Sequence, residues 1–260
     1  MTVSMTVAAG QASCAALDVP ANVATAADLV RRAADRGADL LVLPELFLTG
    51  YELAAIVADP GRYAPGPGDA RLDPLAAACA QTGTAVVAGA PGHDPATGAV
   101  FISAVVLDRA GRYAARYDKQ HATATERATG ISPGTAGCRV TLDGWRLGLG
   151  ICADSGFPGH ARAAALDGCH AYLVGGLFSP GHDPGTMPAR ARDNARYAVL
   201  ANHCAPTGPY HGYGHSAVWN PDGTLLSDAG DCDPGLAVAR LDPAVLDRVR
   251  TAEPIPAVTV

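Results

Sequence analysis

Lysine and glutamate are nearly missing from this sequence of 260 residues. Of its 19 basic residues only Lys119 is a lysine, and of its 25 acidic residues only four are glutamates: Glu45, Glu52, Glu126 and Glu253. A lysine ammonium is compact and can lose its proton, whereas the arginine guanidinium is planar and stays charged. We therefore expect Lys119 to occupy a position where arginine does not serve.

Dense basic runs and long apolar runs are missing as well. A net charge of −6 without a block of Lys and Arg argues against nucleic acid or an anionic membrane as the main partner. No stretch approaches the roughly 20 uninterrupted apolar residues of a membrane-spanning helix. The N-terminal sequence also lacks the basic and apolar regions of a secretory signal. We expect a cytoplasmic protein that binds neither nucleic acid nor membrane.

The seven cysteines lack the short C-x-x-C spacing of redox and zinc motifs. Because their number is odd and their spacing irregular, the sequence predicts neither a disulfide framework nor a structural zinc site. A metal site around His203, His211 and His215 is an alternative, but these residues lie at irregular intervals in a Gly- and Pro-rich segment. We expect no metal and no cofactor.

Short apolar runs bounded by Gly, Pro or Asp alternate with alanine-rich stretches of helical length. The pattern predicts strands at 2–8, 40–43, 84–88, 100–107, 146–151, 171–174, 197–201, 216–219 and 237–241. It predicts helices at 24–36, 74–81, 160–167, 188–196 and 243–250. No linker or repeat divides the chain, so we expect one continuous α/β domain over residues 1–260.

Three chemically distinctive side chains follow predicted strands, where α/β folds place their ligands. Glu45 lies in the apolar segment ADLLVLPELF, where desolvation raises the pKa of a carboxyl toward that of a general base. The alternative for Glu45 is a structural role in the following turn. Lys119 follows a strand pair, with His121 and Glu126 close behind. Cys152 ends a strand before a turn and helix, where backbone N–H groups can stabilise an oxyanion. We interpret the remaining cysteines as inert: Cys14, Cys79, Cys138, Cys169, Cys204 and Cys232.

Together these segments resemble the nitrilase superfamily, the carbon-nitrogen hydrolases. Glu in L-P-E-L, Lys in Y-x-K-x-H and Cys in G-x-x-I-C-x-D follow one another as in the Glu-Lys-Cys triad of that family. Flanking blocks extend the resemblance from TVAAGQA at the start to GHSAVWNPDGTLL near the end. The resemblance implies an α/β fold of the four-layer α-β-β-α sandwich type. It also implies a homodimer or higher homo-oligomer.

The resemblance assigns a role to each matched residue. Cys152 would be the nucleophile that forms a thioester with the substrate, and Glu45 would transfer the protons. Lys119 and the backbone N–H of Ala153 would stabilise the developing oxyanion. Glu126 matches the second glutamate of the family and would orient Lys119 or the substrate.

The sequence departs from the family directly after the cysteine. In the block C-x-D-x-R-F-P-E, the usual Arg and Glu are Gly156 and Gly159, and the usual aromatic after the cysteine is Ala153. These changes remove an ion pair and open space beside the nucleophile. By proximity to the triad motifs, we expect four residues to line the substrate pocket: Tyr51, Phe157, Phe178 and His182.

We expect an amidase that releases ammonia from a small linear carboxamide, because Ala-Asp after Cys152 differs from the Trp-Glu of a nitrilase proper. An N-carbamoyl amine or amino-acid hydrolase and a nitrilase are the alternatives within the family. Transfer of the acyl group to an amine instead of water would use the same thioester. A binding or scaffold protein that has lost activity through Gly156 and Gly159 is the alternative outside enzymes.

Overall fold

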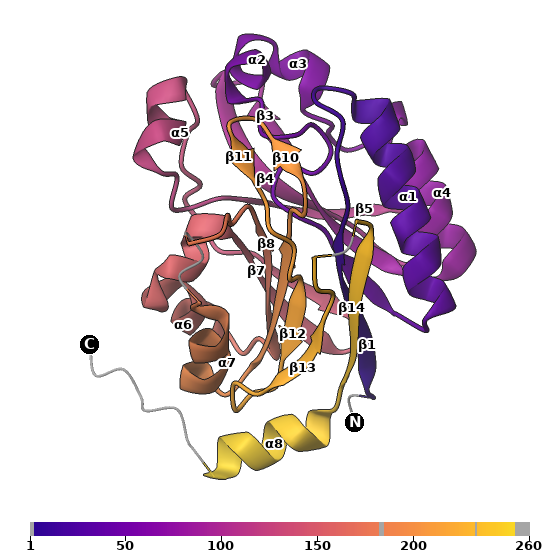
Figure 1. Cartoon of the computed structure of the whole chain (residues 1–260), viewed down its shortest axis with the longest axis vertical. Helices are drawn as coiled ribbons and strands as arrows, with labels where there is room; N and C mark the ends of the chain where they lie inside the picture. The colour runs from indigo at the N-terminus through magenta and orange to yellow at the C-terminus, as the bar shows by residue number, and fades with distance from the viewer. Residues whose placement is uncertain (1–2, 182–184, 232, 253–260) are drawn as a thin grey trace.

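Two six-stranded sheets pack face to face in the computed structural model, which describes residues 3–181, 185–231 and 233–252 (Figure 1). The first sheet has the strand order β14 (Gly235–Leu241), β1 (Met5–Gln11), β2 (Leu40–Val42), β3 (Ala85–Asp94), β4 (Ala99–Leu107) and β5 (Tyr113–Asp118). The second has the order β13 (Leu225–Asp228), β12 (Ala217–Trp219), β9 (Tyr197–Asn202), β8 (Ala171–Gly176), β7 (Trp145–Ile151) and β6 (Arg139–Leu142).

Both sheets contain three neighbouring parallel strands with antiparallel strands outside them. In the first sheet β1, β2 and β3 are parallel, and in the second β7, β8 and β9 are parallel. Strand β5 is antiparallel to β4, which is antiparallel to β3, so β5 runs in the direction of β2. The loops that follow β2 and β5 therefore leave the first sheet at the same edge.

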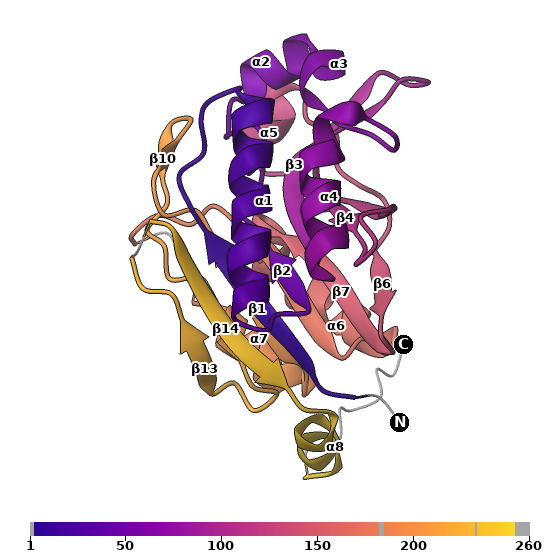
Figure 2. The same cartoon turned by 90° about the vertical axis from the view of Figure 1, so that its right-hand side faces the viewer.

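Helices cover the outer face of each sheet. Figure 2 shows α1 (Val19–Asp35) and α4 (Asp73–Thr82) side by side over the first sheet, and α6 (Pro158–Leu166) and α7 (Met187–Asn194) cover the second. This arrangement confirms the expected four-layer α-β-β-α sandwich. Helix α8 (Pro243–Ala252) follows β14 at the end of the described chain. No helix in the described ranges is long and apolar enough to cross a membrane.

The burial of both sheets between layers explains their apolar strands, because a strand covered on both faces needs apolar side chains at every position. All residues of β2 and β9 are buried. Helix α1 buries an apolar stripe and begins five residues before the predicted start. Asp18 accepts a hydrogen bond from the Ala21 N–H as its N-terminal cap, and Pro20 fits the first turn because its missing N–H has no partner there.

The nine predicted strands and five predicted helices are present with shifted ends, while several short elements were not predicted. Edge strands such as β6 alternate between exposed and half-buried residues and carry charge, so their apolar signal is weak. Strand β5 is the second strand of the pair expected before Lys119. The elements that were not predicted as separate units are α2 (Leu53–Ala58), α3 (Pro60–Tyr63), η1 (Ala70–Leu72), α5 (Ala124–Thr129), η2 (Cys152–Gly156), β6, β10 (Pro206–Thr207), β11 (Tyr210–His211) and β13.

Candidate active site

Glu45, Lys119 and Cys152 all lie just beyond the ends of strands. Glu45 comes three residues after β2, Lys119 directly after β5, and Cys152 directly after β7 in the other sheet. Because the two sheets pack face to face, the three strand ends converge from both layers. The fold thus brings together residues that are separated by 74 and 33 positions along the chain.

Two glycines hold the backbone that carries Glu45. A Cβ atom at Gly89 of β3 would lie 2.0 Å from the Pro44 carbonyl oxygen, and one at Gly175 of β8 would lie 2.7 Å from the Leu43 carbonyl oxygen. The loop therefore passes between a glycine of each sheet, where any larger residue would displace it. His203 adds a third contact, because its Nε2–H donates to the Glu45 carbonyl oxygen at 2.6 Å. Burial lowers the pKa of His203 to about 4, which keeps this ring neutral.

Lys119 forms ion pairs with two glutamates. Its Nζ donates to Glu45 Oε1 at 2.7 Å and to Glu126 Oε1 at 2.6 Å. The Lys119 side chain is 0% exposed and those of Glu45 and Glu126 are each 1% exposed, so water does not screen these charges. Burial alone would lower the pKa of Lys119, but the surrounding negative groups outweigh it and raise the pKa above its ordinary value. The ammonium is therefore charged at neutral pH.

Glu126 is fixed by three further contacts at the start of α5. Its Oε1 accepts a second hydrogen bond from the Tyr51 hydroxyl at 2.5 Å, and its Oε2 accepts one from the Thr123 N–H at 2.7 Å. Thr123 in turn accepts from the Glu126 N–H, which completes a capping box. The sequence T-A-T-E carries this helix-start signal, which the pattern analysis did not use. Glu126 thus combines a structural cap with the contact to Lys119.

The pKa of Glu45 is raised to about 7. Burial is the main cause and the Glu126 charge adds to it, while Lys119 and the Cys152 thiol oppose it. Oε2 of Glu45 is buried and has no hydrogen-bond partner among the described residues. A carboxyl with this pKa and a vacant oxygen can both accept and return a proton near neutral pH.

Cys152 begins η2 with a backbone φ of +44°, in the left-handed region that L-residues rarely adopt. Its thiol lies 3.8 Å from the Leu177 carbonyl oxygen. Burial and the Glu45 charge raise the pKa of this thiol, and Lys119 lowers it in part. The resting thiol is therefore protonated, and a base must remove its proton before it can attack. Ala153 follows in the first turn of η2.

The predicted pocket residues have different surroundings. Tyr51 is buried behind Glu126, and Phe178 is buried in an apolar cluster against which Cys152 also packs. Phe157 is 50% exposed and stacks on His121 with ring centroids 3.9 Å apart. His182 lies outside the described residues. A Cβ atom at Gly156 or Gly159 would meet nothing within 4 Å, in line with the open space expected there.

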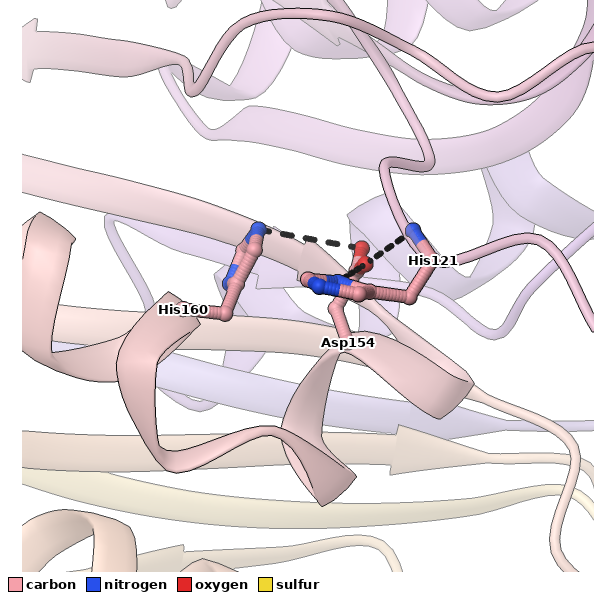
Figure 3. Close-up of side chains that lie close together, drawn as sticks. All are labelled: His121, Asp154 and His160. Atoms are coloured by element: carbon pink, nitrogen blue, oxygen red, sulfur yellow. Dashed lines mark hydrogen bonds and ion pairs between the residues drawn. The ribbon is translucent and has the colours of Figure 1, made fainter.

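Pattern analysis missed a polar network around Asp154, drawn in Figure 3. Suitable ligand atoms of His121, Asp154 and His160 lie within 4.8 Å of one another, so these residues could hold a metal ion by type and proximity. Both Asp154 oxygens, however, already accept hydrogen bonds, and both ring nitrogens of His160 face the hydroxyls of Tyr117 and Tyr172. A metal ion would have to replace these bonds, so we interpret the group as a hydrogen-bond network.

Of the other cysteines and histidines singled out in the sequence, Cys14 and His203 are neighbours, with 4.0 Å between the Cys14 Sγ and the His203 Nδ1. In the described part of the chain, burial raises the thiol pKa of five free cysteines: Cys14, Cys79, Cys138, Cys169 and Cys204. Cys232 is not among the described residues. His203 donates a hydrogen bond to the Glu45 carbonyl oxygen, and His215 forms an ion pair with Asp228. Among the described residues, His203, His211 and His215 do not form a group that could bind a metal ion.

Comparison with known proteins places this geometry in a family. The model of the carbon-nitrogen hydrolase family matches residues 6–251. A Pseudomonas protegens protein named "hydrolase in pqqF 5'region" is 33% identical over 239 residues, covering 90% of this chain and 81% of the relative. The omega-amidase Nit3 of Saccharomyces cerevisiae is 28% identical, covering 96% of this chain and 91% of the relative.

Solved structures agree in fold. An amidase of the nitrilase superfamily from Nesterenkonia sp. AN1 superposes with a TM-score of 0.82 at 31% identity, covering 95% of both chains. The crystal structure of Saccharomyces cerevisiae Nit3, a nitrilase-superfamily member, gives a TM-score of 0.88 at 26% identity, covering 98% of this chain and 96% of Nit3. On the family match and the shared fold, the chain belongs to the carbon-nitrogen hydrolase family of the nitrilase superfamily.

Proposed function

We propose that this protein hydrolyses a small linear carboxamide through a thioester on Cys152 and releases ammonia. The observation that carries the proposal is a buried Glu45, with a pKa of about 7 and a vacant oxygen, beside a protonated thiol and a charged Lys119. Nucleophilic catalysis by cysteine needs a proton acceptor and a positive counter-charge, and this cluster provides both.

In the proposed first half-reaction Glu45 Oε2 takes the thiol proton while Cys152 Sγ attacks the carbonyl carbon of the amide. A tetrahedral intermediate forms, and its oxygen becomes negative. Glu45 then gives the proton to the amide nitrogen, the C–N bond breaks, and ammonia leaves. The acyl group stays on Cys152 as a thioester.

The second half-reaction uses the same carboxylate. Glu45 removes a proton from a water molecule, whose oxygen attacks the thioester carbon. The C–S bond breaks, the carboxylic acid leaves, and the thiolate regains a proton from Glu45. One carboxyl can serve as base and acid in turn only if its pKa lies near the working pH, as that of Glu45 does.

Lys119 is the proposed stabiliser of the negative oxygen in both half-reactions. An ammonium has three N–H donors, and two of them are used by Glu45 and Glu126. The third donor remains for the substrate oxygen, and the backbone N–H of Ala153 is the proposed second donor. One well-placed donor of this kind contributes on the order of 3 kcal/mol to the stabilisation of a transition state.

The relatives support an amide substrate. Mutants of the Nesterenkonia amidase have been crystallised in complex with butyramide and with acrylamide, and another mutant shows Michael addition of acrylamide at the active site cysteine. Omega-amidases are among the similar curated proteins, as are an N-carbamoylputrescine amidase from tomato and a nitrilase from Pyrococcus abyssi. We propose an amide substrate for this chain because both compounds, butyramide and acrylamide, are short, uncharged carboxamides.

Ammonia release from butyramide and acrylamide by the purified protein tests the proposal. We expect turnover by the parent and by the control Cys138→Ala, and a loss of more than about 1,000-fold in Cys152→Ala because the nucleophile is gone. Equal rates for Cys152→Ala and the parent would refute the role of Cys152. Carbon dioxide released together with ammonia from N-carbamoyl compounds, with no amide turnover, would instead identify an N-carbamoyl hydrolase.

Iodoacetamide labelling separates an enzyme from a non-catalytic binding protein. Burial raises the thiol pKa of all six described cysteines, so faster labelling at Cys152 than at the other five would show that Glu45 takes up its proton. Peptide mass spectrometry measures the rate at each cysteine. Slow and uniform labelling would favour the non-catalytic alternative.

A further inference from the structure

Asp154 is a fully buried carboxylate that accepts four hydrogen bonds. Its Oδ1 accepts from the backbone N–H of His121 at 2.9 Å and from the ring Nδ1 of the same residue at 2.8 Å. Its Oδ2 accepts from the Tyr117 hydroxyl at 2.7 Å and from the Ile151 N–H at 3.0 Å. Exposure of the Asp154 side chain is 0%. Each oxygen therefore uses both of its lone pairs within the protein.

These four donors come from the two chain segments that carry Lys119 and Cys152. Tyr117 and His121 flank Lys119 at two positions on either side, at the end of β5. Ile151 is the last residue of β7 and directly precedes Cys152. The two strands belong to different sheets, so no backbone ladder connects them. Asp154 contacts both segments at once.

We propose that Asp154 is a positioning residue that sets the place of the Cys152 thiol relative to Lys119, and that His121 completes this clamp. The inference rests on the proposed function of these two residues. It assigns Asp154 and His121 no contact with the substrate. Their effect passes through the backbone of the two segments, and a displacement of about 1 Å in an active site can reduce the rate about 100-fold.

The chemistry of the site requires a carboxylate. An ionised carboxyl only accepts hydrogen bonds, which matches four donors, whereas an asparagine amide would point an N–H group at one of them. The left-handed backbone of Cys152 gives a second reason. A non-glycine residue in that region persists only where surrounding contacts hold it. The bond from the Ile151 N–H to Asp154 is one such contact, and the bond from the Ser155 hydroxyl to the Cys152 carbonyl oxygen is another.

His121 offers the cleanest way to test the clamp. Its ring donates through Nδ1 to Asp154 and stacks on Phe157, and its side chain is 33% exposed, so substitution there should leave the fold intact. The side-chain nitrogen of an asparagine can take the place of Nδ1 and keep the donor. A leucine fills similar space without a donor. The pair His121→Asn and His121→Leu therefore separates the hydrogen bond from the bulk of the ring.

The experiment compares these two variants with Asp154→Asn and with the control Asp118→Asn. Asp118 directly precedes Lys119, but its carboxylate contacts Ser103 and Arg116 and makes no recorded contact with the Cys152 segment. Values of kcat and KM for butyramide are measured together with the rate of Cys152 alkylation by iodoacetamide. Thermal melting reports the folded fraction of each variant.

We expect kcat to fall about 30-fold in Asp154→Asn and about 10-fold in His121→Leu, with KM changed less than about threefold. His121→Asn and Asp118→Asn should retain kcat within about threefold, and alkylation rates should follow the same order. Equal kcat in His121→Leu and His121→Asn would overturn the clamp, as would a lower melting temperature with unchanged kinetics per folded molecule. If Asp154→Asn does not fold, the His121 pair decides. If the parent hydrolyses no amide, the proposed function fails, while Cys152 alkylation still tests the clamp.

Discussion

Two groups of cations in this molecule have different kinds of partners, and one group is fully buried while the other is partly exposed. Lys119 lies between the carboxylates of Glu45 and Glu126 at the strand ends. The arginine cluster, defined as Arg146, Arg196 and Arg250, lies at the carboxyl end of α6. None of these three arginines forms an ion pair with a carboxylate in the described ranges; they bind backbone carbonyl oxygens instead.

The arginine cluster binds carbonyl oxygens at the carboxyl ends of two helices, α6 and α7. Arg196 donates to the carbonyl oxygens of Asn194, Ala195 and Ala165 at 2.9 to 3.1 Å, and Arg146 donates to that of Gly168 at 2.6 Å. The last carbonyls of a helix lack partners within it and carry partial negative charge, so cations are stabilising there. Burial lowers the pKa of Arg196 to about 10, with further lowering by Arg250 and other arginines. A guanidinium keeps its proton even so.

The difference separates structural cations from the one proposed to be catalytic. Carbonyl oxygens accept the hydrogen bonds of a guanidinium, and neither group gains or loses a proton near neutral pH. Two carboxylates around one ammonium, by contrast, leave Glu45 with a pKa of about 7 and Lys119 with a free donor. The three arginines thus make fixed contacts with carbonyl oxygens, while the single lysine is at the position where the proposed chemistry needs a compact charge.

Lys119→Arg gives the largest expected effect and tests this contrast directly. The side chain is fully buried between two glutamates, and a longer, planar guanidinium cannot keep both contacts and also leave one donor for an oxyanion. We expect turnover to fall at least about 1,000-fold, as measured by ammonia release. Arg196→Lys is the matched exchange in the arginine cluster and should keep turnover. An active Lys119→Arg enzyme would refute the assigned role.

Glu126→Gln is expected to reduce kcat about 50-fold, because Lys119 loses one of its two anionic partners. The Glu126 charge also raises the pKa of Glu45. Its removal should therefore move the acidic limb of the kcat/KM profile to lower pH. Rates over a series of pH values measure both effects, and an unshifted limb would contradict the coupling between the two glutamates.

The pH dependence of the unmodified enzyme is expected to follow Glu45. The carboxyl must be deprotonated to accept the thiol proton, and its pKa is about 7. Values of kcat/KM should therefore fall about tenfold per pH unit as the pH drops below 7. Profiles recorded above the pH of unfolding measure this limb. A limb near pH 4 to 5, the ordinary range of a glutamate, would mean that the pKa of Glu45 is not raised.

Arg196→Met should give the smallest effect on turnover and a measurable effect on stability. The substitution removes three hydrogen bonds to carbonyl oxygens from a side chain that is 8% exposed. We expect the free energy of unfolding to fall by about 2 kcal/mol, with kcat within about twofold of the parent. Urea denaturation and ammonia release measure the two quantities. If fully folded Arg196→Met lost activity, the arginine cluster could no longer be called structural in contrast to Lys119.

Much of the fold followed from local pattern. Strands buried on both faces read as continuous apolar runs, so β2, β7, β8 and β9 were predictable near their true positions. The motifs around Glu45 and Cys152 were recognisable because each lies within a few residues of such a strand, whereas Lys119 was recognisable as the single lysine of the sequence. The edge strand β6 and the short helices were missed, since the residues of β6 are exposed or half exposed and short helices depend on neighbours elsewhere in the chain.

The sequence by itself determined which residues are available: one lysine, four glutamates, a cysteine at a strand end, and the α/β alternation that carries them. Only the tertiary structure decided that Asp154 joins two sheets, that glycines clasp the Glu45 loop and that distant arginines meet at one helix end. The pKa of Glu45 is also decided only by the tertiary structure. Burial and neighbouring charge set that pKa, and both arise from segments far apart in the chain that become neighbours only when the sheets pack.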